Sequence, residues 1–219
     1  PLIVSIPGSG ELKSKPTQHS VKELLSNGIQ PDVLVVRTDS PITEDIRRKI
    51  ALFCNVEPDW VIQNATASTR YEVPLLLERE GLCRVVCRKL RLACGEPDMC
   101  EWRALVGRIR SVHRRVRIAL VGKYTGLHDA YLSVAESLFH AGTACDASVD
   151  IEWVDSESLC EDNIAGRLSG CGGILVPGGF GDRGIEGMIL AARYAREQRI
   201  PYLGICLGMQ VAVIEFARH

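Results

Sequence analysis

The chain has 219 residues, and its 46% of hydrophobic residues is enough for a packed core. Its 26 Lys and Arg residues nearly balance its 27 Asp and Glu residues, so the net charge of −1 gives no sign of a polyanion-binding surface. The sequence shows neither a signal peptide nor an apolar run of membrane length, which favours a cytoplasmic protein that contacts neither nucleic acid nor membrane. The length suits one large domain or parts of two.

The cysteine pattern argues against two kinds of stabilisation. Nine cysteines are scattered along the chain without a Cys-x-x-Cys pair. An odd number of cysteines in a chain of this length does not indicate a disulfide framework. The five histidines do not cluster with the cysteines, so the sequence does not predict a zinc site either.

A capping-box pattern opens the first predicted helix. Ser20 is followed three residues later by Glu23, and we expect the helix to run through Leu25. The apolar run over residues 32–37 then predicts a strand that is buried on both faces, the type found in parallel sheets.

The second helix is marked by acidic residues at its start. Thr43 and the two acids that follow it suit the first turn of a helix. Ile46, Ile50 and Phe53 recur at helical spacing and predict its buried face. Residues 71–115 show short helical pieces rich in Arg and Cys, which we interpret as the tail of a first domain and a linker.

Strands and helices alternate in the second half of the chain. Strands are expected at 116–122, 149–153, 172–176 and 202–205, and helices at 129–140, near Asn163, at 185–196 and at 207–216. This alternation predicts an α/β fold with doubly wound parallel sheets. The predicted division is a first domain over 1–95, a linker over 96–115 and a second domain over 116–219.

One cysteine lies where a nucleophile is expected. Cys206 falls between the strand that ends at Ile205 and the helix that begins at Leu207, with Gly204 and Gly208 two residues away on either side. A sharp strand-to-helix turn strains the corner residue and requires small neighbours, as in a nucleophile elbow. The adjacent helix N-terminus favours the thiolate. A buried structural cysteine is the alternative, but packing alone explains the paired glycines poorly.

A glycine-rich loop follows the strand predicted at 172–176. It reads Pro-Gly-Gly-Phe-Gly-Asp-Arg-Gly from Pro177 to Gly184. Glycines after a parallel strand leave backbone N–H groups free to face a ligand, as an oxyanion hole requires. Taken alone, the segment could equally be an ordinary loop. One helix and one strand separate it from Cys206, so we expect both at the carboxyl edge of the sheet, where open α/β sheets bind ligands.

A second candidate site precedes the first predicted helix. Lys13 and Lys15 alternate with the hydroxyl residues Ser14 and Thr17. Positive charge and the N–H groups at a helix start would suit a triphosphate. The alternative is a pair of solvated surface lysines.

These motifs resemble a known family. The run Gly-Ile-Cys-Leu-Gly-Met-Gln at 204–210, with Pro-Gly-Gly-Phe-Gly upstream, is similar to the triad glutamine amidotransferases. The stretches 10–24, 49–56 and 120–124 resemble more closely the CTP synthases, which aminate UTP with ammonia released from glutamine. The resemblance covers nearly the whole chain and is weakest over 63–115. It implies the tail of a P-loop-like amidoligase (synthetase) domain, followed by the first half of a flavodoxin-like class I glutaminase domain.

The resemblance implies roles in the glutaminase half. Cys206 would be the nucleophile. The residues implied in oxyanion and glutamine binding are Gly179, Leu207, Gly208, Met209 and Gln210. A GTP-effector site is implied at Lys123, Arg183, Gly184 and Glu186. In the family the partner His and Glu come much later, so we expect an interior fragment that is inactive alone.

In the synthetase half the resemblance implies nucleotide contacts. Those with UTP or CTP are Lys13, Ser14, Lys15, Pro16, Thr17, Gln18 and Lys49, where Ser14 replaces the usual Thr and keeps a hydroxyl. ATP contacts are implied at Ala65, Thr66 and Ala67, in a run that departs from the family pattern. The phosphate-binding loop and the magnesium-binding acids of the family would precede residue 1, so this chain is expected to hold no metal ligand.

The implied function is the ATP-dependent amination of UTP to CTP in a homo-oligomer, from dimer to tetramer or filament. Mg²⁺ would serve in the whole enzyme, and GTP would activate it. Two alternatives stay open. Another glutamine amidotransferase with a different acceptor is one, although such an enzyme does not need the segment 13–18. A non-catalytic interaction fragment is the other, and a phosphate loop upstream with a His-x-Glu downstream in a longer reading frame would exclude it.

Overall fold

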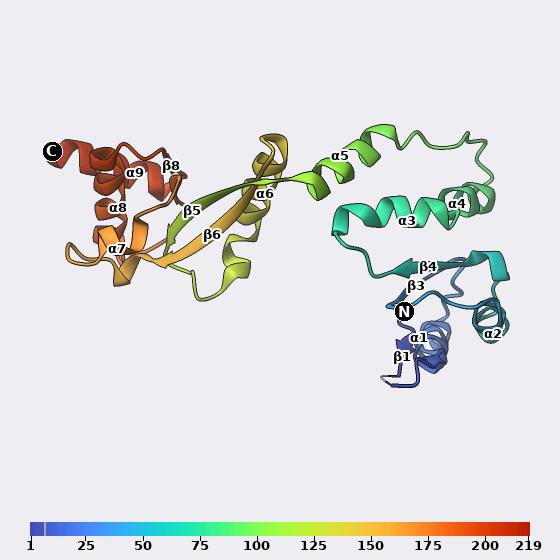
Figure 1. Cartoon of the computed structure of the whole chain (residues 1–219). Coiled ribbons are helices and arrows are strands. Elements are labelled where there is room, and N and C mark those ends of the chain that lie inside the picture. Colours follow the sequence, from blue (N-terminus) through green and yellow to red (C-terminus); the bar gives the residue numbers. More distant parts are fainter. Residues whose placement is uncertain (7) are drawn as a thin grey trace. The chain divides into compact units, whose positions relative to one another are not determined.

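The computed structural model describes residues 1–6 and 8–219, and the chain divides into two compact units, 1–107 and 108–219 (Figure 1). Each unit has a parallel sheet and a hydrophobic core of its own. No helix in the described part of the chain combines the length and the apolar character needed to span a membrane.

The first unit is built on two parallel strands. They are β3 (Leu34–Thr38) and β4 (Val61–Ala65). Leu34 lies opposite Val61 and Thr38 opposite Ala65, and alternate residues of β3 are buried. A small antiparallel hairpin of β1 (Val4–Ser5) and β2 (Leu12–Lys13) precedes them.

Five helices accompany these strands in the described residues of the first unit. They are α1 (Lys15–Ser26), α2 (Glu44–Cys54), α3 (Val73–Arg79), α4 (Leu82–Leu90) and α5 (Cys100–Ser111). Thr43 caps α2 by accepting a hydrogen bond from the Ile46 N–H at 3.4 Å. Val21 of α1 and Ile50 of α2 pack in one hydrophobic core with the buried residues of β3. Most of the predicted linker is occupied by α5, and the boundary between the two units along the chain falls within this helix.

Two details of the helix predictions are wrong. The first helix begins at Lys15 rather than at Ser20, because Pro16 suits a first helical turn. The Ser20 hydroxyl donates to the Pro16 carbonyl inside the helix instead of capping it. In α2 the buried stripe includes Ile50 and Cys54, so the Phe53 side chain turns outward and is 61% exposed.

The second unit carries a four-stranded parallel sheet in the order β6-β5-β7-β8. The strands are β5 (Arg114–Gly122), β6 (Ala147–Asp155), β7 (Gly173–Val176) and β8 (Tyr202–Gly204). The strand order reverses between β5 and β7, and ligands bind open α/β sheets outside the carboxyl ends at such a switch point. The loops after β5 and β7 are therefore the expected walls of a site.

Helices cover both faces of this sheet. On one face α6 (Leu132–Ala144) packs its Val134 and Leu138 with Leu120 and Leu175 of the sheet. The other face is covered by α7 (Ile164–Leu168), α8 (Ile185–Gln198) and α9 (Leu207–Arg218), as their shared core of buried residues shows. The doubly wound parallel arrangement predicted from the alternation of elements is confirmed.

Candidate active site

Cys206 stands at a strained corner between β8 and α9. Its backbone angles are φ 55° and ψ −107°, in a region that residues with a Cβ rarely occupy. The Cys206 thiol is free and exposed. The strained corner expected of a nucleophile elbow is thus present at this position.

The two glycines around the corner are required by close backbone contacts. A Cβ on Gly208 would lie 1.9 Å from the Val176 carbonyl oxygen, and a Cβ on Gly204 would lie 2.4 Å from the Gly208 carbonyl carbon. The Ile205 N–H donates to the Val176 carbonyl at 2.9 Å, and the Tyr202 hydroxyl donates to the Gly208 carbonyl at 2.7 Å. Contacts between backbones therefore fix the position of the Cys206 sulfur.

The glycine-rich loop after β7 lies beside this sulfur. A Cβ on Gly178 would lie 3.9 Å from Cys206 Sγ, so Gly178 backs directly onto the thiol. Gly179, which the sequence singled out, packs instead on the stem of Lys123, where its Cβ would lie 3.1 Å from Cδ. The predicted loop thus lies beside the thiol through Gly178, a residue that was not among the predicted ones.

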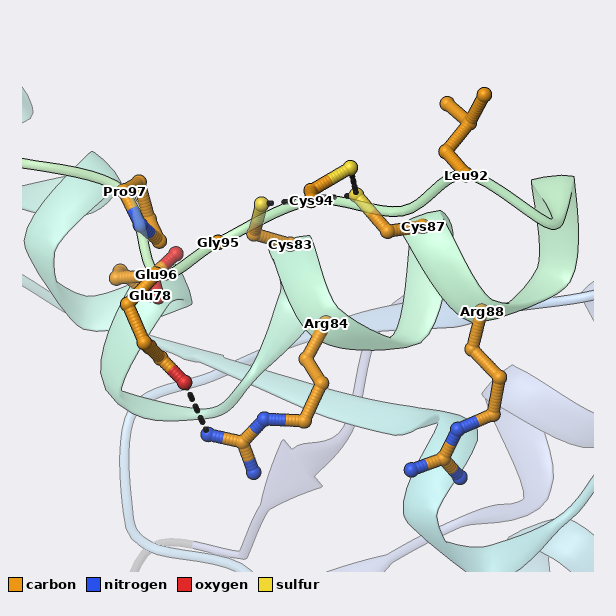
Figure 2. Close-up of a pocket in the computed structure, with 10 residues that line it drawn as sticks. All are labelled: Glu78, Cys83, Arg84, Cys87, Arg88, Leu92, Cys94, Gly95, Glu96 and Pro97. Atoms are coloured by element: carbon orange, nitrogen blue, oxygen red, sulfur yellow. Dashed lines mark hydrogen bonds and ion pairs between the residues drawn. The ribbon is translucent and has the colours of Figure 1, made fainter.

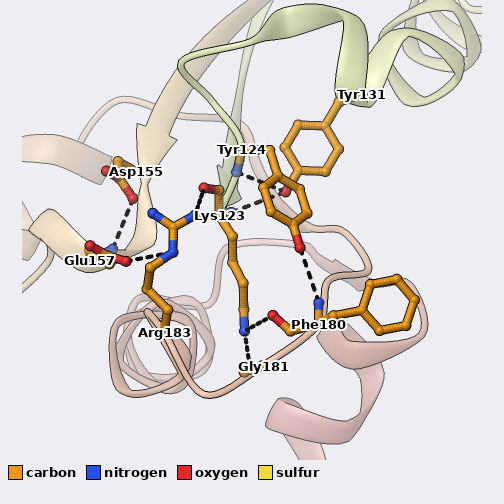
Figure 3. Close-up of polar contacts among 8 residues, drawn as sticks. All are labelled: Lys123, Tyr124, Tyr131, Asp155, Glu157, Phe180, Gly181 and Arg183. Carbon is orange, nitrogen blue, oxygen red and sulfur yellow. Dashed lines mark hydrogen bonds and ion pairs between the residues drawn. The ribbon is translucent and has the colours of Figure 1, made fainter.

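The Lys123 side chain extends to this loop and contacts its backbone (Figure 3). It follows β5, is 3% exposed, and its Nζ donates to the Phe180 carbonyl at 3.2 Å and to the Gly181 carbonyl. A buried ammonium needs such acceptors, and the two carbonyls are turned toward it in return. The Lys123 ammonium therefore has partners within the protein and orients the loop.

Two tyrosines complete the support of the loop. The Phe180 N–H donates to the Tyr124 hydroxyl at 3.3 Å. The Tyr131 hydroxyl accepts from the Lys123 N–H at 3.0 Å and from the Tyr124 N–H at 3.3 Å, and burial raises the pKa of Tyr131. Neither tyrosine was predicted as a site residue. Tyr124 follows the predicted site residue Lys123 in the chain, whereas no sequence motif marks Tyr131.

Arg183 joins the same group of contacts. Its Nη2 donates to the Lys123 carbonyl at 2.7 Å, and its Nε lies 2.8 Å from Glu157 Oε1. The Glu157 N–H in turn donates to Asp155 Oδ1 at 3.0 Å (Figure 3). Two members of the predicted effector site, Lys123 and Arg183, are thus in direct contact.

The other two members of that predicted site have different surroundings. A Cβ on Gly184 would lie 2.2 Å from Ser156 Oγ, so Gly184 packs on the segment after β6. Glu186 is paired with Arg218 at the end of α9, with 2.9 Å between Oε2 and Nη1. Gly184 therefore adjoins the group around Arg183, while Glu186 faces α9.

The remaining predicted glutamine-pocket residues lie on the first turn of α9. Leu207 packs partly into the core, Met209 is 57% exposed, and Gln210 is exposed. The histidine that follows Cys206 in the chain, His219, lies past the far end of α9. A helix of 12 residues spans about 18 Å, so the His219 imidazole is out of reach of the Cys206 sulfur.

In the first unit, the hydroxyls predicted to meet a triphosphate make hydrogen bonds within the protein. Thr17 is fully buried, and its hydroxyl donates to the Leu2 carbonyl at 2.8 Å. Ser14 is 3% exposed, and its Oγ accepts a bond from Gln18 Nε2 at 3.0 Å. Because the helix starts at Lys15, these side chains belong to its first turns and anchor it.

The three lysines predicted to contact nucleotide phosphates differ in their ion pairing and in their place in the fold. Lys15 is exposed on the first turn of α1, and Lys49 is exposed on α2. Lys13 Nζ lies 2.5 Å from Glu11 Oε1, in a surface ion pair. Among these three lysines, Lys15 is the one placed at a helix N-terminus, where backbone N–H groups lack helical partners.

The residues predicted to contact ATP lie at the end of β4 and directly after it. Ala65 ends β4, the Thr66 N–H donates to the Thr38 carbonyl at 3.0 Å, and Arg37 Nη2 donates to Thr66 Oγ1 at 3.2 Å. Within residues 1–6 and 8–219 no hydrogen bond or ion pair joins residues 65–67 to 13–18. In the same residues, no three His, Cys, Asp or Glu side chains form a group that could hold a metal ion.

Two protein families match the chain. Residues 1–92 match "CTP synthase N-terminus", and residues 127–219 match "Glutamine amidotransferase class-I". A solved structure of the Trypanosoma brucei CTPS glutaminase domain with bound acivicin is 50% identical and covers 48% of this chain and 41% of that chain, with a TM-score of 0.45.

Curated relatives match the chain from end to end. The CTP synthases of Halalkalibacterium halodurans, Geobacillus kaustophilus and Bacillus subtilis are 60%, 57% and 54% identical over 218 residues. Each match covers 100% of this chain and 41% of the relative, so the chain spans about two fifths of the length of these relatives. The chain is therefore similar along its whole length to CTP synthases.

Proposed function

We propose that Cys206 is the nucleophile of a glutaminase site, in a whole protein that makes CTP from UTP, ATP and glutamine. The observation that carries this proposal is the corner conformation of Cys206, together with the glycine contacts that hold it. A strained backbone conformation costs free energy, and such conformations cluster at functional sites. The strain that three backbone segments impose on Cys206 therefore favours a functional role over a packing role. The similarity to CTP synthases supplies the substrate class.

At this site, Cys206 Sγ would attack the carbon of the glutamine side-chain amide. The resulting tetrahedral oxyanion would receive hydrogen bonds from the backbone N–H groups of Gly179 and Leu207. Collapse of this intermediate would break the C–N bond and release ammonia, leaving a thioester that water hydrolyses to glutamate. The base for this chemistry is not His219, which is held at the far end of α9.

The residues that contact the glycine-rich loop would set the geometry of the oxyanion-binding N–H groups. Lys123 and Tyr124 hold the carbonyl and N–H groups of Phe180, and so they set the direction of the neighbouring N–H groups. Arg183 and Gly184 lie at the outer end of the same group of contacts. We place the GTP effector there, where its binding would shift the loop through Arg183.

In the first half of the chain, Lys13, Lys15 and Lys49 would meet the phosphates of UTP or of the product CTP. ATP would phosphorylate the 4-oxygen of the uracil ring, and ammonia would displace this phosphate. Mg²⁺ would neutralise phosphate charge when bound with ATP. The described residues form no group that could hold this ion, so none of these steps is assigned to a metal ligand in them. The protein would work in the cytoplasm as a homo-oligomer.

The test of the proposed function uses two cysteine variants of the whole protein. Cys206→Ala should abolish glutamine-dependent CTP formation and leave ammonia-dependent formation largely intact. Cys160→Ala, at another exposed cysteine of the second unit, should change neither activity. Loss of both activities in Cys206→Ala would contradict the nucleophile role and assign Cys206 to the structure alone.

A second measurement concerns the 219-residue chain by itself. Because no histidine of the described residues after Cys206 reaches its sulfur, this chain should show no steady hydrolysis of glutamine. Release of glutamate and ammonia can be followed with time. Sustained turnover would show that another group in these residues acts as the base.

A further inference from the structure

Three cysteines gather along α4 and the segment that follows it: Cys83 and Cys87 lie on the helix, and Cys94 lies after it (Figure 2). Cys94 Sγ lies 2.9 Å from Cys87 Sγ, and Cys83 Sγ lies 4.0 Å from Cys87 Sγ. They line a cavity of about 210 Å³ together with the side chains of Arg84 and Arg88. Neither the nucleotide residues nor the glutaminase residues include any of these thiols.

The approach of Cys94 to Cys87 is set by the backbone. Arg91 follows the last residue of α4 with φ 56°, in the left-handed conformation. The Leu92 N–H donates to the Cys87 carbonyl at 2.9 Å, and the Arg91 N–H donates to the Arg88 carbonyl at 3.2 Å. These two bonds make a Schellman motif, which ends the helix and reverses the chain. Cys94 is carried back toward α4 as a result.

A second contact holds the returning segment. Arg84 Nη2 lies 3.5 Å from Glu96 Oε1, so the chain follows α4 for at least two residues beyond Cys94. Figure 2 shows the Arg84 and Glu96 side chains joined on one side of the segment, and the sulfurs of Cys87 and Cys94 joined on the other. The returning segment is therefore held beside α4 by a contact that does not involve the thiols.

The two thiols differ in accessibility, and the pKa of Cys87 is raised. Cys94 is exposed, whereas Cys87 is half-buried. The hydrogen bond with Cys94 raises the pKa of Cys87 to about 12, and Cys83 adds to this effect. Cys87 is thus held as a neutral thiol, and the exposed Cys94 is the thiol that an incoming reagent meets first. Once Cys94 is modified, the main cause of the raised pKa of Cys87 is removed.

The distance and the local structure suit a disulfide. A disulfide needs its sulfurs about 2.05 Å apart, so the two sulfurs must approach by less than 1 Å. Cys94 lies in a segment, residues 92–99, that has neither helix nor strand and can supply this movement. A thiolate metal site is the other use of clustered cysteines. Cys83 is more distant from Cys87 than Cys94 is, and in the described residues no three His, Cys, Asp or Glu side chains form a group that could hold a metal ion.

We propose that Cys87 and Cys94 form a reversible dithiol–disulfide site that reacts with small-molecule disulfides. The Cys94 thiolate attacks one sulfur of the small disulfide, whose S–S bond breaks and releases one small thiolate. Cys87 then loses its proton to solvent and attacks Cys94 Sγ, which expels the second small thiolate. The two protein thiols lose two electrons, and the small disulfide is reduced to two thiols. An excess of small thiol reverses both steps.

The bond would fasten residues 92–94 to the last turn of α4. This proposal is independent of the proposed function, since it involves no residue of the nucleotide or glutaminase sites. In compartments that keep thiols reduced, disulfides of this kind are transient and report the redox state.

The test exposes the folded protein to oxidised glutathione, blocks the remaining thiols with iodoacetamide and digests with trypsin without reductant. Arg88, Lys89 and Arg91 lie between the two cysteines, so Cys87 and Cys94 fall on separate tryptic peptides. We expect a linked pair of these peptides in the mass spectrum and a loss of two reactive thiols from the nine of the chain. Excess reduced glutathione should restore both thiols.

Matched variants separate this site from general thiol oxidation. Cys94→Ser should abolish the linked peptides, whereas Cys100→Ser, at an exposed cysteine outside the cluster, should retain them. In the folded protein the link should form at least about tenfold faster than in guanidinium, because the fold holds the thiols together. Glutathione adducts spread over the exposed cysteines with no Cys87–Cys94 link, a Cys83–Cys87 link instead, or an equal rate in guanidinium would each overturn the proposal.

Discussion

The corner at Cys206 and the segment 13–18 are both candidate sites, but they are built in different ways. At Cys206 the reactive atom is placed by backbone contacts that involve Gly178, Gly204 and Gly208. In the segment 13–18 the small hydroxyl side chains hold the helix to its own unit, and Lys15 alone extends from the first turn of α1 into solvent.

Nucleophilic catalysis and phosphate binding place different structural requirements on the protein. A nucleophile must be held within a fraction of an ångström, so its position depends on close contacts that tolerate no added atom. Phosphate recognition by lysine uses a flexible point charge, which needs reach more than a rigid frame. Substitutions at the corner should therefore change folding and catalysis together, while substitutions at the lysines should change binding alone.

The largest expected effect is that of Gly208→Ala. Its new Cβ would meet the Val176 carbonyl oxygen at 1.9 Å, and neither backbone can give way without moving α9 from β7. We expect the free energy of unfolding to fall by about 3 kcal/mol or more, measured by denaturant titration. Gly166→Ala in α7 is the control, because nothing lies within 4 Å of its Cβ, and it should raise stability by about 0.5–1 kcal/mol. Equal effects of the two would refute the elbow contacts.

Lys15→Ala should have the next largest effect, on binding rather than on folding. Loss of a charge-assisted phosphate contact costs about 1.5–3 kcal/mol, or one to two decades in affinity. In the whole protein, the UTP requirement should rise and inhibition by CTP should weaken, while basal glutamine hydrolysis stays the same. The free energy of unfolding should change by less than about 0.5 kcal/mol.

Lys22→Ala, at an exposed lysine further along α1, is the matched control for Lys15 and should leave both nucleotide titrations unchanged. If Lys15→Ala also leaves them unchanged, the segment is a solvated surface and the comparison between the two sites does not hold.

Lys123→Met tests whether the glycine loop needs its buried cation. The change leaves the Phe180 and Gly181 carbonyls without their donor, which should lower the free energy of unfolding by about 1–3 kcal/mol. In the whole protein, kcat for glutamine hydrolysis should fall further than stability alone explains. Tyr124→Phe removes one acceptor at 3.3 Å and should have a smaller effect on both. An unchanged kcat in Lys123→Met would show that the loop keeps its position without the ammonium.

The smallest effect concerns the pH dependence of the ion pair between α8 and α9. Arg196 donates to both oxygens of Glu215, at 2.7 to 3.1 Å, and holds the pKa of that carboxyl below its ordinary value of 4.5. A lowered pKa gives stability that is fully present above pH 4.5 and is lost as the pH falls through the folded-state pKa.

Unfolding titrations between neutral and acidic pH should therefore show a steeper loss of stability in the native chain than in Glu215→Gln. Glu197→Gln, at a more exposed partner of the same arginine, should keep the native pH dependence. If stability depends on pH in Glu215→Gln as it does in the native chain, the Arg196–Glu215 pair does not stabilise the packing of α9, the helix that begins after Cys206.

The sequence by itself determined the features that depend on neighbours along the chain. Cys206 between Gly204 and Gly208 specifies a corner because sterics at one turn involve only a few consecutive residues. The alternation of strands with helices also predicted the doubly wound parallel sheet. The hydrophobic periodicity that marks a strand or a helix depends only on residues close together in the sequence. The start of α1 was also local, because Pro16 marks it more strongly than the capping-box pattern at Ser20.

The tertiary structure alone decided which distant residues meet. Lys123 supports Phe180 from 57 positions away, Gly178 rather than Gly179 backs the thiol, and the Thr17 hydroxyl turns to Leu2. The physical reason is that a buried polar group must find a partner wherever the fold brings one, and that partner is set by strand order and register rather than by any local pattern.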